Sequence, residues 1–146
     1  MAKARQGIIK GQTPFGACIV KGNKVIACGH NAVWSSNNIT LHAEIVAIGA
    51  ACKALKAIDL SKCTIYSTCE PCPMCFSACH WARISRIVFG CCIKDARNFG
   101  FNEMVVSNLK LRELIKSKVK ITGGLKRQEN LELFEFWQKQ AKGKAY

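Results

Sequence analysis

Two short motifs contain residue types that bind zinc. The first is HAE at residues 42–44, and the second is PCPMC at residues 71–75. One histidine and two cysteines make three zinc ligands, and a zinc site with three protein ligands keeps its fourth position open for water. Such an open site suits hydrolysis, because zinc makes hydroxide available near neutral pH. We therefore expect His42, Cys72 and Cys75 to bind one catalytic zinc ion.

Glu44 supplies a carboxylate two residues after the histidine ligand. Residues two apart point roughly 200° from each other on a helix, so we expect both in the first turn, with the metal beyond the helix end. Thr40 or Asn38 is expected to cap this helix. A carboxylate near the metal can take a proton from water and deliver it to a substrate. Glu44 is therefore the predicted proton shuttle.

Eight of the ten cysteines fall into two groups. Cysteines scattered singly among apolar residues are expected to be free and to pack as small hydrophobic side chains. A second group lies within eleven residues, and such a group in a reducing compartment indicates metal binding or catalysis. The scattered cysteines are Cys18, Cys28, Cys52 and Cys63, and the close group is Cys69, Cys72, Cys75 and Cys79.

The close group also has the spacing of a bacterial iron–sulfur ligand run. The proline that usually follows such a run is absent, because His80 stands there. An electron carrier would also give Glu44 no role. The iron–sulfur interpretation is therefore an alternative to zinc, on which Cys69 and Cys79 are packing residues.

The hydrophobic pattern predicts the elements that position these motifs. Apolar runs around a Gly-Asn turn predict a β-hairpin over residues 15–29. Alternating strands and helices indicate one α/β domain over residues 1–146 with a mixed sheet. The expected helices cover residues 41–55, 72–82, 107–118 and 129–140, and the expected strands cover residues 63–68, 86–91 and 119–122.

The chain has a formal net charge of +13. Its lysines are spread from Lys3 to Lys144, and those near the C-terminus alternate with acidic residues. This spread favours a mixed, solvated surface, and binding of a polyanion such as tRNA is the alternative. No apolar run reaches the roughly 20 residues that span a bilayer, and no signal peptide is recognised, so we expect a cytoplasmic protein that does not enter membranes.

The two motifs together form the H-x-E…P-C-x-x-C pattern, and the sequence resembles the cytidine deaminase superfamily. The resemblance runs from Thr13 to the C-terminus through the segments PFGACIV, GHN, LHAEIVAI, CEPCPMC and WARI. It implies hydrolytic deamination of a nucleobase or nucleoside, with one zinc ion per subunit. It also implies a three-layer α/β/α sandwich around a five-stranded mixed sheet, usually in a homodimer.

Within this superfamily the sequence looks most similar to the guanine deaminase branch, which converts guanine to xanthine and ammonia. The similarity lies in GFNE at residues 100–103 and in the aromatic C-terminal segment, which in that branch closes over the active site, often that of the partner subunit. The short segment before PFGA and Asn102, where an acidic residue is expected, depart from the branch. The residues that the resemblance implies in substrate binding are Asn31, Phe15, Trp81, Glu103, Tyr146 and Ala43.

Three other functions stay open. A tRNA adenosine deaminase would suit the positive charge, although such enzymes usually have valine at the position of Phe15 and leucine at that of Cys69. A cytosine or cytidine deaminase is a second alternative. A non-enzymatic zinc module is the third, and it predicts a fourth protein ligand and no role for Glu44.

Overall fold

A five-stranded sheet forms the centre of the chain. The computed structural model describes residues 1–140 and 144–146. The strand order is β2-β1-β3-β4-β5, with β1 antiparallel to β2 and β3, and with β3, β4 and β5 parallel. The predicted mixed sheet is therefore confirmed. The strands are β1 (Gly16–Lys21), β2 (Lys24–His30), β3 (Cys63–Cys69), β4 (Arg86–Cys91) and β5 (Lys120–Thr122).

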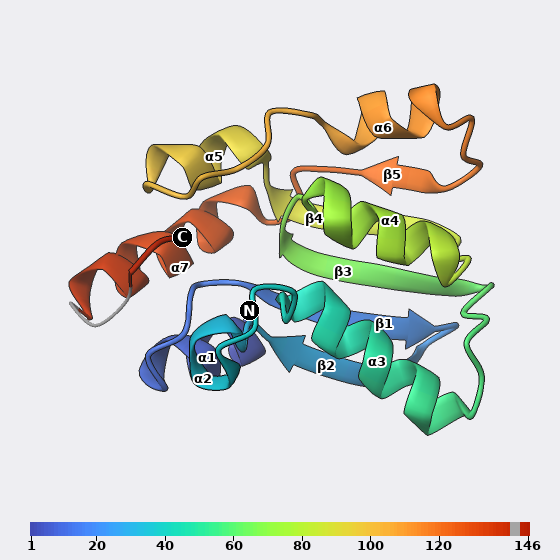
Figure 1. Cartoon of the computed structure of the whole chain (residues 1–146), viewed down its shortest axis with the longest axis horizontal. Coiled ribbons are helices and arrows are strands. Elements are labelled where there is room, and N and C mark those ends of the chain that lie inside the picture. The colour runs from blue at the N-terminus through green and yellow to red at the C-terminus, as the bar shows by residue number, and fades with distance from the viewer. Residues whose placement is uncertain (141–143) are drawn as a thin grey trace.

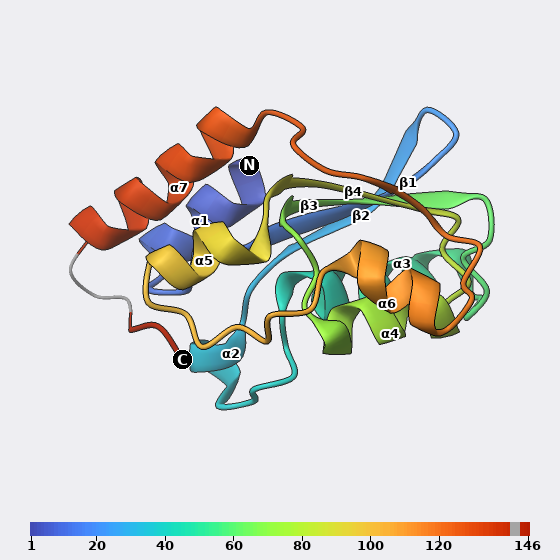
Figure 2. The ribbon, with the colours of Figure 1, turned by 90° about the horizontal axis from the view of Figure 1, so that it is seen from above.

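Helices cover both faces of this sheet. One layer contains α3 (Ala43–Leu55), α4 (Pro73–Trp81) and α6 (Asn108–Leu114), and the other contains α1 (Ala2–Ile9) and α7 (Arg127–Lys139) (Figures 1 and 2). The short helices α2 (Val33–Ser36) and α5 (Ile93–Asn98) lie in connections. This is the expected three-layer α/β/α sandwich. None of the helices in the described residues combines the length and apolar character needed to cross a bilayer.

The central strands carry the core. In β4, Ile87, Val88 and Phe89 are consecutive and all buried, because helices pack on both sides of a central parallel strand. Phe76 of α4 and Phe134 of α7 are buried on opposite sides of the sheet and fill the two interlayer spaces. The sequence pattern predicted α6 to run to residue 118, whereas the helix ends at Leu114.

The first turns of α3 and α4 lie at the edge of the sheet where β3 ends. The N-caps are His42 and Cys72, both in extended backbone conformation and neither with a side-chain cap bond. The predicted capping by Thr40 or Asn38 was therefore wrong. The Asn38 side-chain oxygen instead accepts hydrogen bonds from the backbone N–H and the hydroxyl of Thr40 at 3.0 and 2.7 Å.

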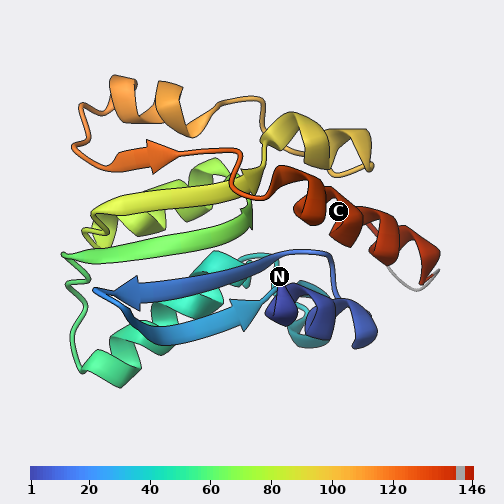
Figure 3. The same ribbon diagram turned by 180° about the vertical axis from the view of Figure 1, so that it is seen from behind.

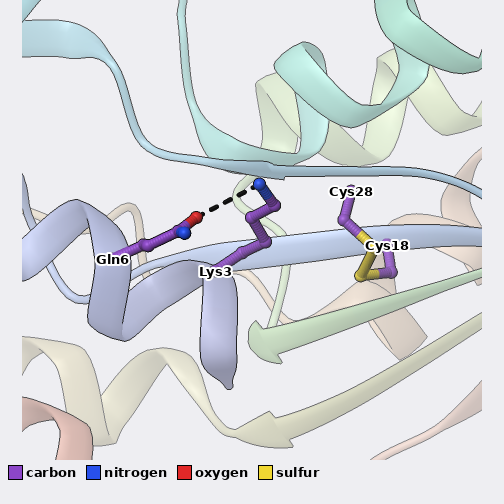
Figure 4. The surroundings of a disulfide bond; sticks show 4 residues. All are labelled: Lys3, Gln6, Cys18 and Cys28. Atoms are coloured by element: carbon purple, nitrogen blue, oxygen red, sulfur yellow. Dashed lines mark hydrogen bonds between the residues drawn. A yellow bond between two sulfur atoms is a disulfide. The ribbon is translucent and has the colours of Figure 1, made fainter.

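A disulfide joins Cys18 of β1 to Cys28 of β2. The expectation that these two cysteines are free was wrong, while Cys52 and Cys63 are free as predicted. The register of the hairpin shifts by one residue between Ile19 and Val20, and this irregularity sets Cys18 opposite Cys28. Figure 4 shows the disulfide beside Lys3 of α1, whose ammonium group donates to Gln6 at 3.1 Å.

The helix that precedes β1 is short. α1 has eight residues and packs near one end of β1 and β2, and α7 packs against β4 on the same face, so part of this face carries no helix (Figure 3). Tyr66 of β3 is 39% exposed.

Candidate active site

Three metal-ligand side chains meet between the first turns of α3 and α4. The ligand atoms of His42, Cys72 and Cys75 all lie within 4.8 Å of one another. The Nδ1 atom of His42 lies 3.6 Å from each cysteine sulfur. A tetrahedral zinc ion binds nitrogen at about 2.0 Å and sulfur at about 2.3 Å, which places such ligand atoms about 3.6 Å apart. The donor set and its spacing therefore fit zinc.

The local backbone explains this convergence. His42 and Cys72 are the N-caps of their helices, so their side chains project from the helix ends, and Cys75 follows in the first turn of α4. A helix N-terminus favours negative charge and so stabilises a thiolate. Hydrogen bonds from the Cys75 thiol and from His42 lower the pKa of Cys72 to about 4 despite its burial. Cys72 is thus a thiolate at neutral pH, the form that binds metal.

Glu44 lies beside these ligands in the interior. It is 5% exposed, and its Oε2 atom lies 3.5 Å from the Cys75 sulfur. Its Oε1 atom accepts a 2.6 Å hydrogen bond from the Ser67 hydroxyl on β3. Burial raises the pKa of Glu44, and the bond from Ser67 partly opposes this rise. A buried carboxyl with a raised pKa is suited to exchanging protons near neutral pH.

A cavity opens next to the ligand cluster. Its volume is about 300 Å³, the lower end of the range for pockets that bind small molecules. Burial raises the pKa of Glu103, which lines the cavity, to about 7. The full lining consists of Ile39, His42, Cys72, Pro73, Met74, Asn102, Glu103, Met104 and Tyr146.

Tyr146 places the C-terminus over this cavity. Its hydroxyl accepts a 2.6 Å hydrogen bond from the side-chain amide of Asn31, and its ring lies 5.7 Å from that of His42. The Trp34 indole donates to the Lys144 carbonyl at 3.0 Å, and the Asn102 N–H donates to the Tyr146 carbonyl at 3.1 Å. In this structure Tyr146 therefore forms part of the wall of the cavity of its own chain.

Asn31 is held by its neighbours before any substrate binds. It is fully buried, and its side-chain oxygen accepts a hydrogen bond from the Val33 N–H at 3.1 Å. Its amide nitrogen is thereby directed toward Tyr146. Ala43, the first residue of α3, is also fully buried.

Two predicted pocket walls lie elsewhere. Phe15 is 9% exposed and packs in the core against Phe101 and Phe134, with ring centroids 4.9 and 5.6 Å away. Trp81 is 81% exposed at the last residue of α4. It lies about 12 Å along the helix from the first turn, at 1.5 Å per residue. The structure does not bring Phe15 or Trp81 to the cavity of this chain.

The remaining cysteines of the close group do not join the cluster. Cys69 and Cys79 are buried and free, and burial raises the pKa of Cys69 well above its usual range. Within the described part of the chain, the group of side chains able to hold a metal is limited to His42, Cys72 and Cys75. This arrangement favours an open zinc site over both the iron–sulfur cluster and the closed zinc module.

Ser67 is a site residue that the sequence analysis did not identify. It faces α3 from β3, on the same side as the buried Ile65, and its hydroxyl contacts Glu44. A polar side chain at an inward position of an otherwise apolar strand was the available signal.

Comparison with known proteins agrees with this geometry. Residues 1–91 match the family model of the cytidine and deoxycytidylate deaminase zinc-binding region. The guanine deaminase of Bacillus subtilis (strain 168) is 46% identical over 93 residues, which are 64% of this chain and 60% of that protein. The matched segment thus spans less than two thirds of that relative.

Two further matches cover more of the chain. The tRNA-specific adenosine deaminase of Buchnera aphidicola subsp. Schizaphis graminum (strain Sg) is 39% identical over 119 residues, which are 82% of this chain and 76% of that protein. A solved structure of the guanine deaminase from Nitrosomonas europaea superimposes with a TM-score of 0.84 at 27% identity, covering 93% of this chain and 79% of that one.

Proposed function

Since the chain belongs to the cytidine and deoxycytidylate deaminase family, we propose that it is a zinc-dependent hydrolase that converts guanine and water to xanthine and ammonia. The observation that carries the choice of guanine is the position of Tyr146. This residue lines the cavity of about 300 Å³, and its hydroxyl accepts a bond from Asn31. A free base fits a cavity of this size, whereas a base attached to RNA needs room for its backbone where the C-terminal residues lie.

The reaction uses the residues gathered at the helix starts. A zinc ion held by His42, Cys72 and Cys75 would supply the Lewis acidity that makes hydroxide available near neutral pH. Glu44 takes the proton of the attacking water and delivers protons to the ring nitrogen and to the leaving ammonia. The Ser67 hydroxyl holds Oε1 of Glu44, which leaves Oε2 directed toward the cluster.

The substrate contacts follow from the polar groups around the cavity. The side-chain amide of Asn31 is in position to donate to an acceptor of the base once Tyr146 moves away. Glu103 offers a carboxyl group to the N–H groups of the guanine edge. Ala43 is proposed to contact the base through its backbone, because its methyl group is fully buried.

A tRNA adenosine deaminase is the second candidate. It is favoured by the match to a tRNA-specific relative over 82% of this chain and by the net charge of +13. It would require the C-terminal residues to leave the cavity and admit an RNA loop. A cytosine or cytidine deaminase rests on the family membership alone.

We also propose that two copies of the chain pair through α3 and α4. Along residues 43–50 of α3 and 73–81 of α4 the exposed positions carry no charged residue, with Gly49 and Ala50 exposed on α3 and with Ser77 exposed and Ala78 half-buried on α4. Exposed Trp81 lies at the end of the same face. Small residues let helices approach closely, so this face suits a second copy related by a two-fold axis.

The test is a panel of substrates given in parallel to the zinc-loaded protein. Guanine, guanosine, cytosine, cytidine, adenine and an anticodon stem-loop RNA are each incubated, and ammonia release is measured. We expect turnover of guanine. Turnover of the RNA alone would overturn the guanine assignment in favour of the tRNA enzyme, and no turnover of any substrate with zinc bound would overturn the deaminase assignment.

A further inference from the structure

The positive charge of the chain gathers at one end of the sheet. β3, β4 and β5 begin at this end and α3, α4 and α6 end there, at the right of Figure 1, opposite the candidate active site. We call this surface the basic edge. Ten of the chain's 22 Lys and Arg residues form it: Lys21, Lys24, Lys53, Lys56, Lys62, Arg83, Arg86, Lys116, Lys118 and Lys120. The prediction of a mixed, solvated surface is therefore wrong for this end of the sheet.

Few acidic groups balance the basic edge. Asp59 pairs with Arg83 at 3.1 Å, and Glu113 pairs with Lys110 at 3.0 Å. Across residues 1–140 and 144–146, Arg83 is the one member of the basic edge that forms an ion pair. The uncompensated charge produces a positive field that attracts polyanions.

Four members of the basic edge have left-handed backbone conformations. Lys56, Lys62, Arg83 and Lys116 have φ values of 51°, 69°, 57° and 52°. Such positions favour glycine or asparagine, and other side chains adopt them at an energetic cost. Lys126, outside the basic edge, has a φ of 49° as well, so this surface is distinguished by its charge and its groove and not by its backbone.

A groove runs through the basic edge. Its volume is about 480 Å³. The hydroxyl oxygens of Ser85 and Ser117 accept bonds from the N–H groups of Lys62 and Val119, so both hydroxyl hydrogens remain to be donated. The lining of the groove consists of His80, Arg83, Ile84, Ser85, Lys116, Ser117, Lys118, Val119 and Lys120.

We propose that the basic edge binds the phosphate backbone of a single-stranded nucleic acid in this groove. Ammonium, guanidinium and hydroxyl donors are the groups that contact phosphate oxygens in proteins. A groove admits a single strand, whereas the flat headgroup layer of a membrane would reach only its rims. Arg86 and Cys91 lie at opposite ends of β4, about 17 Å apart at 3.3 Å per residue, so a base in the active site does not reach the basic edge. This binding is a second activity, separate from deamination.

The test measures binding of the full chain to a fluorescent 20-nucleotide RNA and to DNA of equal length, at several salt concentrations. The variant K116Q/K118Q/K120Q removes three charges from the groove, and K3Q/K10Q/K139Q removes three exposed charges elsewhere. We expect the groove variant to bind both strands at least tenfold more weakly. We also expect the slope of log K against log salt to fall by about 2, since each lost phosphate contact lowers it by about 0.7. The matched variant should stay within about twofold of the wild type.

Other outcomes would overturn the proposal. Equal losses in both variants would mean that only the net charge matters, and no loss in the groove variant would exclude the groove. Binding of the wild type to phosphatidylserine vesicles but not to either strand would identify a membrane partner instead. Guanine turnover should be unchanged in both variants, so the result does not depend on the proposed deaminase activity.

Discussion

Among the single residues, Glu44 carries most of the proposed chemistry. Glutamine has its size but cannot transfer the proton, so we expect Glu44→Gln to keep its zinc and to lose turnover by about 10²- to 10⁴-fold. Zinc is measured by atomic absorption and turnover by ammonia release. Glu129→Gln on the exposed side of α7 is the matched control. Full activity in Glu44→Gln would remove this residue as the proton shuttle.

Ser67 is expected to position Glu44 without touching the substrate. Ser67→Ala leaves Oε1 of a buried carboxyl without its 2.6 Å partner, so we expect kcat to fall about tenfold, with KM changed less than about twofold. Ser67→Thr retains the hydroxyl and should recover most of kcat. If the threonine variant is as slow as the alanine variant, the contribution of Ser67 is steric and the positioning role is wrong.

The convergence of the three metal-ligand side chains was predictable because each motif begins a helix. His42 and Cys72 fall at helix starts, and one turn of α4 brings Cys75 to the same point. The resemblance implied that Asn31 and Tyr146 both take part in substrate binding, but the contact between them was not predicted, because 115 residues separate them. A helical pattern also places a residue on a face without giving its distance from a cavity. Trp81 was assigned to the pocket by resemblance, although the helix expected over residues 72–82 already placed it at the end far from the zinc motif.

At the scale of elements, the disulfide between β1 and β2 is expected to stabilise the hairpin. Cys18 and Cys28 are separated by 10 residues, and closing a loop of this length contributes about 3 kcal/mol through the unfolded chain. A phosphine reductant should therefore lower the free energy of unfolding of the wild type by about 2–3 kcal/mol. The variant C18S/C28S should not respond to the reductant. An equal response of both proteins would assign the effect to other cysteines.

Asp95 links α5 to α7. Its carboxylate accepts bonds from the Cys92 N–H at 2.9 Å and from Nε of Arg127 at 3.1 Å. Burial favours the protonated form, but these bonds outweigh it and lower the pKa of Asp95. Because the pKa of Asp95 is lower in the folded chain than its unfolded value of 3.8, ionised Asp95 stabilises the fold above that pH. This stabilisation is lost as the pH falls through the pKa of the folded state.

We therefore expect Asp95→Asn to destabilise the chain by about 1 kcal/mol at pH 7. The expected value is this small because Arg127 is half exposed, and solvent screens its interaction with Asp95. The difference from the wild type should shrink below about pH 4. Urea unfolding of the variant and the wild type at pH 7 and near pH 3 measures the difference in stability at each pH. Asp59→Asn, in an exposed ion pair with Arg83, is the control and should change little. A difference that is the same at both pH values would show that the charge of Asp95 is not involved.

The principal helices and strands could be predicted from hydrophobic periodicity, but the register of the β1–β2 hairpin could not. A Gly22–Asn23 turn alone would pair residues whose numbers add to 45, as Val20 and Val25 do. The irregularity after Ile19 changes this sum to 46 and so pairs Cys18 with Cys28. No local pattern marks such an irregularity, so the disulfide could not be foreseen. The short helices α2 and α5 were missed for a related reason, since four and six residues are too few to show a helical period.

At the scale of the whole molecule, the proposed pairing of two copies can be tested separately from the placement of Tyr146 in the cavity of its own chain. The double variant A50E/A78E adds charge to the stretch of α3 and α4 that carries no exposed charged residue, and we expect it to sediment as a monomer where the wild type is a dimer. Q138E/K139E on α7 adds negative charge away from this face and should stay dimeric. A monomeric wild type would contradict the proposed interface. Because Tyr146 lines the cavity of its own chain and accepts a bond from Asn31, and because Trp34 donates to the Lys144 carbonyl, the monomeric variant should retain guanine turnover. Loss of turnover with zinc still bound would instead mean that the C-terminal segment is exchanged between subunits in the active enzyme.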